Sequence, residues 1–365
     1  MTRLVAVILA GGGGTRLWPA SRRRRPKQVL HLSGDRSLFA ESIDRLTPWL
    51  PPEQILVATP ADLEQALRRE APGLSDQNFL LEPQPKGTAP VLGLAAVILR
   101  QRDPEAVMAV LTSDHAIQHP ERLHSLLLAG AELASAGKLV TLGIPPETPD
   151  TGYGYIRRGE SLGEVLGEKA FSVRQFKEKP DDATARKYVE SGEYFWNAGM
   201  FLWTPKRLLE EIKRWMPGLH RILTDFGDRG GLRADPGLAK AWASLEPETI
   251  DFGILEHASD LAVLHAAGLG WSDIGSWDRV YHLLHKDGSG NAAQGGEVLA
   301  REATGNLIVA GAEVGKGRLF VLQGVQDLVL IDTGDVLLVC RRDQSGQVRE
   351  IVEHLERTGL ERFLV

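Results

Sequence analysis

Residues 4–28 carry the sequence LVAVILAGGGGTRLWPASRRRRPKQ, which is the most informative stretch of this chain. Its apolar run over 5–9 predicts a buried β-strand. Four glycines, 11–14, follow the strand, and glycine lets backbone N–H groups approach an anion because no Cβ stands in the way. Arg16 and Lys27 add a planar guanidinium and an ammonium, both of which bind phosphate. The stretch is therefore typical of a strand that ends in a nucleoside-triphosphate-binding loop.

Two common glycine-rich phosphate motifs are excluded by spacing. A P-loop needs Gly-Lys followed by Ser or Thr, and no Gly-Lys pair in this chain has that neighbour. The dinucleotide motif G-x-G-x-x-G can be aligned on the four glycines in two ways, which place Arg16 or Leu17 where the third glycine belongs. A merely flexible loop would explain the glycines, but not Arg16, Pro19, Pro26 and Lys27 at their spacing.

Composition limits the class of protein. A chain of 365 residues with 43% hydrophobic residues can bury a sizeable core, and it predicts one large domain and a smaller one. The net charge of −6 gives no reason to expect a nucleic-acid partner. A single cysteine, Cys340, excludes a disulfide framework and a cysteine-rich metal site. Neither a signal peptide nor an apolar run of roughly 18 residues is present, so we expect a cytoplasmic protein that does not enter a membrane.

The first half of the chain alternates strand-like and helix-like segments. The expected strands after the first cover 54–59, 78–82, 107–112 and 138–143. The expected helices cover 38–46, 61–70, 89–102 and 121–136. Such alternation predicts βαβ units, and therefore an α/β fold with a mixed, mostly parallel sheet flanked by helices. Ligands of such sheets bind at the carboxyl ends of the strands, where the glycine loop lies.

From residue 153 the pattern is mixed, with strands expected over 154–158, 171–178 and 198–203 among helices. A second pattern begins near Asn291. The expected strands there cover 306–310, 318–323, 327–332 and 335–341, separated by turn signals. An amphipathic helix over 348–357 closes the chain. We therefore expect a catalytic domain over 1–288 and a small β domain over 289–365. Since no low-complexity linker divides them, they should contact one another.

Two aspartates are candidate metal ligands. Asp114 lies just past the carboxyl end of the strand over 107–112, on the same rim as the glycine loop, and Asp273 lies in a second motif, WSDIGSW. A carboxylate at this rim would repel a triphosphate unless a divalent cation lay between them, so Asp114 implies Mg²⁺. A helix cap or an Asx-turn is the alternative role for Asp114. His115 cannot complete a triad with its own neighbours in sequence, so we expect it to be structural.

Other segments carry groups suited to a sugar phosphate. Gly152 lies in a glycine turn flanked by tyrosines, Glu178 and Lys179 end a strand with a carboxylate and an ammonium, and Asn197 offers an amide. Each of these segments taken singly could equally be a turn, a solvated charge cluster or a buried strand. The 82–90 loop, EPQPKGTAP, is polar and precedes a helix that Thr88 could cap.

Taken together, these segments resemble the bacterial mannose-1-phosphate guanylyltransferases, a branch of the sugar-nucleotide pyrophosphorylases. The resemblance covers residues 4 to about 284. It is carried by LAGGGGTRLWPASRRRRPKQ, EPQPKGTAP, LTSDHAI, GIPPETPDTGYGYI, FKEKP, WNAGMF, FGILEH and WSDIGSW. The region after residue 291 resembles the short β-helical domain of the single-function members. The resemblance implies a Rossmann-like nucleotide-diphospho-sugar transferase fold with a β-helix-like C-terminal domain.

The implied reaction joins GTP and α-D-mannose 1-phosphate to give GDP-mannose and pyrophosphate, by attack of a sugar-phosphate oxygen on the α-phosphorus. The resemblance implies that Asp114 and Asp273 hold Mg²⁺. It also implies that Arg16 stabilises the departing pyrophosphate and that Lys27 stabilises the phosphates in transfer. Lys179 is implied to bind the sugar phosphate. Nucleotide-binding roles are implied for Gly11, Gly12, Gly14, Thr15, Glu82, Gly87 and Thr88. Sugar-phosphate-binding roles are implied for Gly152, Glu178, Lys179 and Asn197.

Two alternatives stay open from the sequence. A guanylyl- or uridylyltransferase for another sugar 1-phosphate would share nearly all of these residues. A non-catalytic homologue that only binds sugar nucleotides would be expected to lose a metal ligand or a basic residue, yet this chain has them all. The apolar runs over 328–331 and 336–339 allow packing on the catalytic domain or a homodimer through the C-terminal domain.

Overall fold

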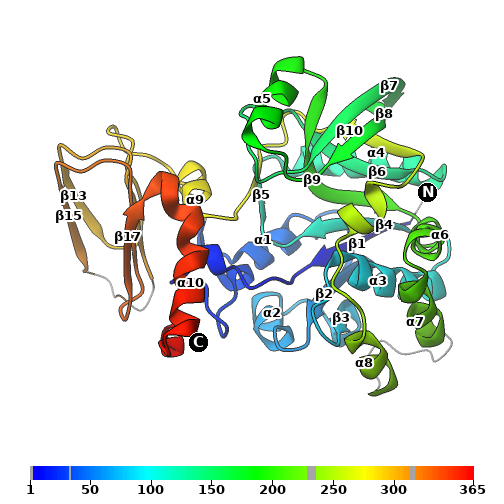
Figure 1. Ribbon diagram of the computed structural model, residues 1–365, viewed down its shortest axis with the longest axis horizontal. Helices are drawn as coiled ribbons and strands as arrows, with labels where there is room; N and C mark the ends of the chain where they lie inside the picture. Colours follow the sequence, from blue (N-terminus) through cyan, green and yellow to red (C-terminus); the bar gives the residue numbers. More distant parts are fainter. Residues whose placement is uncertain (1–2, 33, 228–235, 312–313, 315–316) are drawn as a thin grey trace.

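The computed structural model describes residues 3–32, 34–227, 236–311, 314 and 317–365. A large sheet flanked by helices forms one region, and short strands after residue 291 form a second (Figure 1). Within the described residues, no helix combines the length and the apolar character needed to cross a membrane.

The large sheet has nine strands in the order β3-β2-β1-β4-β9-β6-β10-β8-β7. They are β1 Leu4–Leu9, β2 Ile55–Pro60, β3 Phe79–Glu82, β4 Val107–Thr112, β6 Leu139–Ile144, β7 Tyr155–Val165, β8 Glu168–Lys177, β9 Tyr194–Trp203 and β10 Leu261–His265. Only β8 and β9 run against their neighbours, and the other seven of these nine strands share one direction. This confirms the mixed, mostly parallel sheet expected from the sequence.

Helices cover both faces of the sheet because its central strands are apolar on both faces. In β1, Val5 and Val7 join one core cluster, and the alternate residues Leu4, Ala6 and Ile8 join the other. The first cluster includes α3 Thr88–Arg102, α6 Pro205–Trp215, α7 Pro217–Gly227 and α8 Pro236–Ala243. The second includes α1 Leu38–Asp44, α2 Glu64–Glu70 and α4 Pro120–Ser135. α5 Asp182–Ser191 packs through Ala185 in a smaller cluster with Tyr155 of β7 and Tyr194 of β9.

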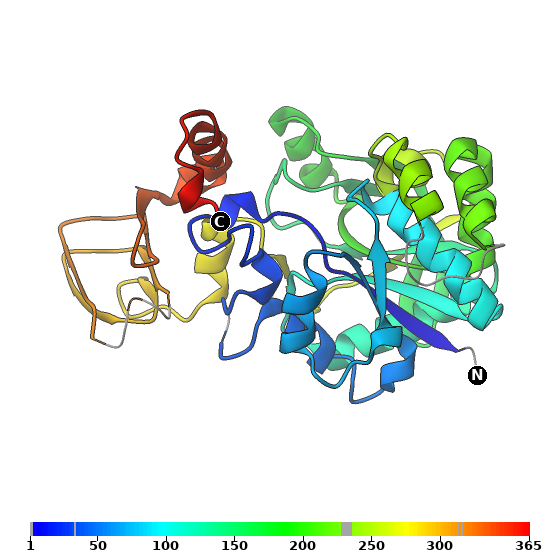
Figure 2. The ribbon, with the colours of Figure 1, turned by 90° about the horizontal axis from the view of Figure 1, so that it is seen from below.

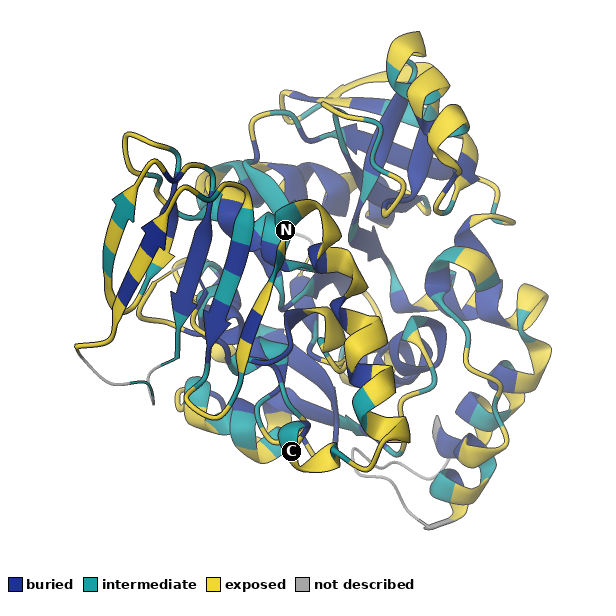
Figure 3. Cartoon of the chain, turned by 60° about the vertical axis from the view of Figure 1, so that its left-hand side comes forward, coloured by how far each residue is buried: buried dark blue, intermediate teal, exposed yellow. Residues whose placement is uncertain are grey.

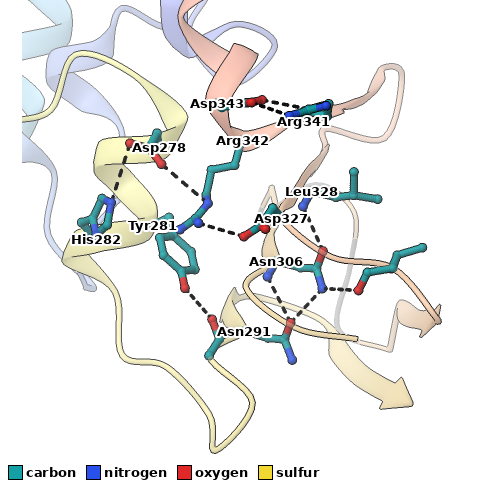
Figure 4. Close-up of polar contacts among 12 residues, drawn as sticks. Asp278, Tyr281, His282, Asn291, Asn306, Asp327, Leu328, Arg341, Arg342 and Asp343 are labelled. Carbon is teal, nitrogen blue, oxygen red and sulfur yellow. Dashed lines mark hydrogen bonds and ion pairs between the residues drawn. The ribbon is translucent and has the colours of Figure 1, made fainter. Parts of the chain in front are cut away.

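The C-terminal region is a small stack of strands. Its strands are β12 Ala292–Gln294, β13 Glu297–Arg301, β14 Leu307–Ala310, β15 Leu319–Gln323, β16 Leu328–Asp332 and β17 Leu337–Arg341. β12, β14 and β16 pair in parallel, as do β13 and β15, so successive turns of the chain stack as in a β-helix. The Asn291 side-chain oxygen accepts hydrogen bonds from the backbone and side chain of Asn306 (Figure 4). Asn306 in turn accepts from the Leu328 N–H, so buried asparagines link neighbouring turns.

The two regions pack together, as the sequence predicts. One core cluster joins Leu17 and Trp18 of the loop after β1 to β14 and β16 and to α10 Val348–Arg357. Figures 1 and 2 show α10 beside that loop. On the other side, Arg342 contacts α9 Trp277–Leu283, where its guanidinium lies 3.6 Å from the Asp278 carboxylate and 3.9 Å from the Tyr281 ring centre (Figure 4).

Several elements differ from the sequence-based expectation. The strand expected over 154–158 continues to Val165 in a hairpin with β8, and its far half is exposed, so no apolar run marks it. Two strands of three residues, β5 His115–Ile117 and β11 Trp271–Asp273, form a separate two-stranded sheet that the sequence analysis missed. This small sheet positions the two candidate metal ligands.

Candidate functional site

The glycine loop is held by side chains that come after it in the sequence. Gln28 is fully buried, and its amide Nε2 donates to the Gly11 carbonyl over 2.6 Å. The Ser21 hydroxyl donates to the Gly13 carbonyl over 3.2 Å. Loop carbonyls thus have partners within the protein, while Gly11, Gly12 and Gly13 themselves stay exposed to solvent. The loop is therefore fixed in shape before any ligand arrives.

Gly14 brings Lys27 to the loop. Its backbone is in the left-handed region, with φ of 58°. A Cβ at Gly14 would lie 2.7 Å from the Cβ of Lys27 and 2.7 Å from the Ser21 hydroxyl oxygen. Glycine is needed here both for the backbone conformation and for the close approach of Lys27.

The fold brings Asp114 and Asp273 together, although 159 positions separate them in sequence. Asp114 lies between β4 and β5, and Asp273 ends β11, which pairs antiparallel with β5. The Ile274 N–H donates to the Asp114 carbonyl over 3.2 Å, so the backbones of the two motifs are directly bonded. The Trp271 indole N–H donates to Nδ1 of His115 over 3.1 Å, which gives His115 the structural role expected from the sequence.

Each of these aspartates has a basic partner. The Lys27 ammonium contacts the Asp114 carboxylate, and the Arg279 guanidinium contacts Asp273. Burial, the largest single effect, raises the pKa of Asp114, but the Lys27 charge together with the smaller effects of His115 and of the Lys27 hydrogen bond outweighs it, and the net pKa is lowered. Burial, and then the Asp114 charge, raise the pKa of Asp273 to about 7. The two carboxylates therefore repel one another, and the basic residues only partly compensate.

The carboxylate pair fits a divalent cation. Its donors are oxygens, which hard cations prefer, and a cation between them would relieve their repulsion. No group of three or more potential metal ligands occurs within the described residues. Mg²⁺ in enzymes that act on nucleotides is commonly held by one or two carboxylates with substrate phosphates and water, so two aspartates suffice.

The residues predicted to bind the sugar phosphate form two groups. Glu178 and Asn197 lie with Asp251, whose carboxylate accepts from the Asn197 amide over 3.0 Å. Burial, followed by the Glu178 charge, raises the pKa of Asp251 to about 7. Lys179 extends toward solvent from the same group and lies 2.5 Å from the Glu178 carboxylate. Two carboxyls and an amide at one position suit the hydroxyls of a sugar.

Gly152 belongs to the second group, close to Asp273. Its N–H donates to the Asp150 carboxylate over 2.7 Å, and Asp150 in turn accepts from Arg279 over 2.9 Å. The Tyr153 hydroxyl donates to Asp273 over 3.0 Å. The glycine turn predicted from the sequence is thus joined directly to the candidate metal ligand.

A cavity of about 450 Å³ lies between the glycine loop and the C-terminal region. Its lining comprises Gly12, Gly13, Thr15, Trp18, Ser21, Arg22, Arg23, Pro26, Pro60, Asp62, Leu63, Pro85, Val352, Glu356 and Leu364. The volume is in the range of small-molecule sites. Gly12 and Thr15, two of the predicted nucleotide-binding residues, line this cavity, and α10 closes its far side through Val352 and Glu356.

The 82–88 loop borders the cavity through Pro85, whereas the predicted residues Glu82, Gly87 and Thr88 are not part of the cavity lining. Glu82 is buried, and burial raises its pKa to about 7. Gly87 has φ of 86° and leaves no space for a side chain against the backbone of Glu248. The Thr88 hydroxyl accepts from the Ile250 N–H over 2.8 Å rather than capping α3, where Gly87 is the N-cap residue.

Five residues of the site were missed by the sequence analysis. They are Gln28, Asp150, Tyr153, Asp251 and Arg279. Gln28, Asp150 and Tyr153 stand within the quoted motifs, so a signal for them was present. Arg279 follows its motif by two positions and had no such signal. The exposed guanidinium of Arg16, a predicted residue, lies near enough to lower the pKa of Asp273.

Comparison with known proteins agrees with this geometry. The family model described as "Nucleotidyl transferase" matches residues 5–289, and that of the "MannoseP isomerase/GMP-like beta-helix domain" matches 301–355. A mannose-1-phosphate guanylyltransferase of Escherichia coli is 34% identical over 98% of this chain and 76% of its own length. The Salmonella typhimurium protein named mannose-1-phosphate guanylyltransferase ManC is 36% identical over 98% of this chain and 74% of its length. This chain belongs to the mannose-1-phosphate guanylyltransferase family.

Solved structures place this guanylyltransferase-family chain in the same fold. A Thermus thermophilus protein described as a mannose-1-phosphate geranyltransferase matches 97% of this chain and 100% of its own, with a TM-score of 0.86 and 31% identity. A Helicobacter pylori protein described as a mannose-6-phosphate isomerase matches 74% of this chain with a TM-score of 0.61 and 24% identity, which shows the fold alone. The predicted β-helix-like C-terminal domain is confirmed.

Proposed function

We propose that this protein transfers GMP from GTP to α-D-mannose 1-phosphate, giving GDP-mannose and pyrophosphate. The observation that carries the proposal is the meeting of Asp114 and Asp273 beside Lys27 and the glycine loop. The substrates are inferred from the family to which the chain belongs. The enzyme is a nucleotidyltransferase, and we propose Mg²⁺ as its divalent cation.

The reaction needs no nucleophile from the protein. A sugar-phosphate oxygen attacks the α-phosphorus of GTP, and the bond to pyrophosphate breaks in line, so the protein contributes positioning and charge. Mg²⁺ bound at Asp114 and Asp273 would supply positive charge to the reacting phosphate oxygens. Lys27 already lies at the glycine loop, and transfer of its ammonium from Asp114 to a phosphate would accompany cation binding. We assign Arg16 to the departing pyrophosphate.

The binding roles are assigned by position. Nucleotide roles go to Gly11, Gly12, Gly14, Thr15, Glu82, Gly87 and Thr88, around the cavity that Gly12, Thr15 and Pro85 line. Sugar-phosphate roles go to Gly152, Glu178, Lys179 and Asn197. Thr88 and Gly87 act through the backbone arrangement of their loop, since their own contacts go to the 248–250 segment.

Asp114→Asn and Asp273→Asn test the proposal. Each should keep the fold and lower turnover by at least about two orders of magnitude, because each removes a ligand charge from the catalytic cation. Asp278→Asn is the matched control, since Asp278 contacts Arg342 on the side of α9 that faces the C-terminal region. This variant should leave turnover unchanged. Pyrophosphate release is measured with Mg²⁺, each nucleoside triphosphate and a panel of sugar 1-phosphates. Near wild-type turnover of either test variant would remove that aspartate from the site, and preference for another pair of substrates would reassign the reaction.

We also propose the domain division at 288/289 and a homodimer through the C-terminal region. The outer face of β13 and β15 exposes Leu299, Leu319 and Val321 by half or more, and Figure 3 shows the alternation of buried and exposed residues on these strands. Val321→Glu should yield monomers in light scattering after gel filtration, whereas Leu128→Glu, on exposed α4 surface, should not. A monomeric wild type would refute the dimer. Cytoplasmic location stays a prediction.

A further inference from the structure

Arg279 joins three side chains that come from two segments of the chain. One guanidinium nitrogen, Nη1, contacts Oδ1 of Asp273, and the other, Nη2, lies 2.9 Å from the Asp150 carboxylate. The guanidinium carbon lies 4.2 Å from the ring centre of Tyr153. Only 20% of the Arg279 side chain is exposed, so these contacts are shielded from solvent. A planar guanidinium with several fixed donors is suited to such bridging.

The contacts of Arg279 fall on the carboxylate that a cation would also need. Oδ1 of Asp273 accepts from the Tyr153 hydroxyl and contacts Arg279 at the same time. A divalent cation at this carboxylate would meet the guanidinium charge at close range, and the two charges would repel one another. Asp150 offers Arg279 a second carboxylate, so the guanidinium can leave Asp273 without losing every partner.

We propose that Arg279 is the built-in counter-ion of Asp273, and that it competes with the divalent cation for this carboxylate in the enzyme without substrates. The inference rests on the proposed function, because it takes Asp273 as a metal ligand. Arg279 is a positioning residue in this account and makes no contact with reacting atoms. Without substrates the enzyme should therefore bind divalent cations weakly. It should bind them more tightly once the negatively charged substrate phosphates are present.

Cation binding without substrates tests the proposal. Mn²⁺ is the probe, and its free concentration is followed by electron paramagnetic resonance at constant ionic strength. Arg279→Gln should lower the Mn²⁺ dissociation constant by about tenfold, which corresponds to about 1.4 kcal/mol. The direction is diagnostic, since damage to the structure would weaken binding. Arg279→Lys, which keeps the charge, should stay near the wild-type value.

Arg342→Gln is the matched control. It removes the same charge from the other side of α9, where Arg342 contacts Asp278, and it should leave the Mn²⁺ constant unchanged (Figure 4). Asp150→Asn should weaken Mn²⁺ binding severalfold, because Arg279 then keeps only Asp273. In the Arg279→Gln background the effect of Asp150→Asn should largely disappear, whereas simple additivity of the two changes would contradict competition through Arg279.

The outcomes separate this inference from the proposed function. One outcome is that Asp273→Asn loses Mn²⁺ binding while Arg279→Gln binds Mn²⁺ as wild type does or more weakly. This result would overturn the competition by Arg279 but would retain Asp273 as a metal ligand. Mn²⁺ binding that ignores Asp273→Asn overturns the metal site and the inference together. Thermal unfolding of each variant is recorded, and if Arg279→Gln does not fold, a tighter Mn²⁺ constant in Arg279→Lys than in wild type overturns the inference.

Discussion

Gly14→Ala should disable the enzyme through Lys27. The Gly14 backbone has φ of 58°, where a residue with a Cβ costs roughly 1–2 kcal/mol. The added Cβ would also lie 2.7 Å from the Lys27 Cβ and from the Ser21 hydroxyl, and overpacking of this kind costs about 1–3 kcal/mol. Together the two effects amount to roughly 2–5 kcal/mol, and the loop can relieve the close contacts by moving Lys27 and Ser21 away.

Displacement of a positioned group by about 1 Å can cost on the order of 100-fold in rate, so we expect a fall of that size in kcat for Gly14→Ala. Gly13→Ala is the control, because φ at Gly13 is not positive and the nearest atom to its Cβ would be 3.9 Å away. Pyrophosphate release and thermal unfolding are measured for both variants. Equal activity and equal melting temperature of the two would refute the reasoning.

Three further predictions concern other parts of the structure. Lys27→Ala should raise KM for GTP, and Lys179→Ala should raise KM for the sugar phosphate. Each increase should be about tenfold, because each variant loses a charged hydrogen bond to phosphate. The opposite pattern in steady-state kinetics would reverse the assignment of the two lysines. Asp335, whose pKa the hydrogen bond from Arg22 lowers to about 2, contributes stability above pH 3.8 that is lost as pH falls toward 2. Because that carboxylate is 46% exposed, Asp335→Asn should lower the free energy of unfolding by only about 1 kcal/mol at pH 7, and denaturant titrations should show this difference shrinking below about pH 4. Gly87→Ala should reduce the soluble yield or the melting temperature markedly, because the positive φ and the Glu248 backbone leave no space for a Cβ. A wild-type melting curve would contradict this prediction.

The sheet was largely predictable because its central strands are continuous apolar runs. β1 and β4 are buried along nearly their whole length, and their residues are almost all apolar. β5 and β11 have three residues each, too few to show any periodicity, so their pairing could not be inferred. β7 was cut short for a different reason, because its far half is exposed and carries charged residues.

The candidate site was predictable residue by residue but not as an arrangement. The sequence marks Asp114 as a carboxylate that follows a strand and Asp273 as a carboxylate within a motif, yet only the tertiary fold decides that they meet. Arg279 looks like any cation on a helix, and one of its partners, Asp150, is 129 positions away. Val352 is an ordinary apolar position of an amphipathic helix, and nothing local reveals that it lines the cavity beside the glycine loop.

The pairing of β5 with β11 also sets an order of events during protein synthesis. The ribosome delivers the glycine loop, Lys27 and Asp114 early, but Asp273 only after most of the chain has been made. The interior strand β10 arrives at nearly the same time, between partners that were synthesised long before it. Since chains fold from the N-terminus as they emerge, an unfinished polypeptide holds a phosphate loop without its second carboxylate. Binding of the cation by both aspartates therefore has to wait until residue 273 has been made.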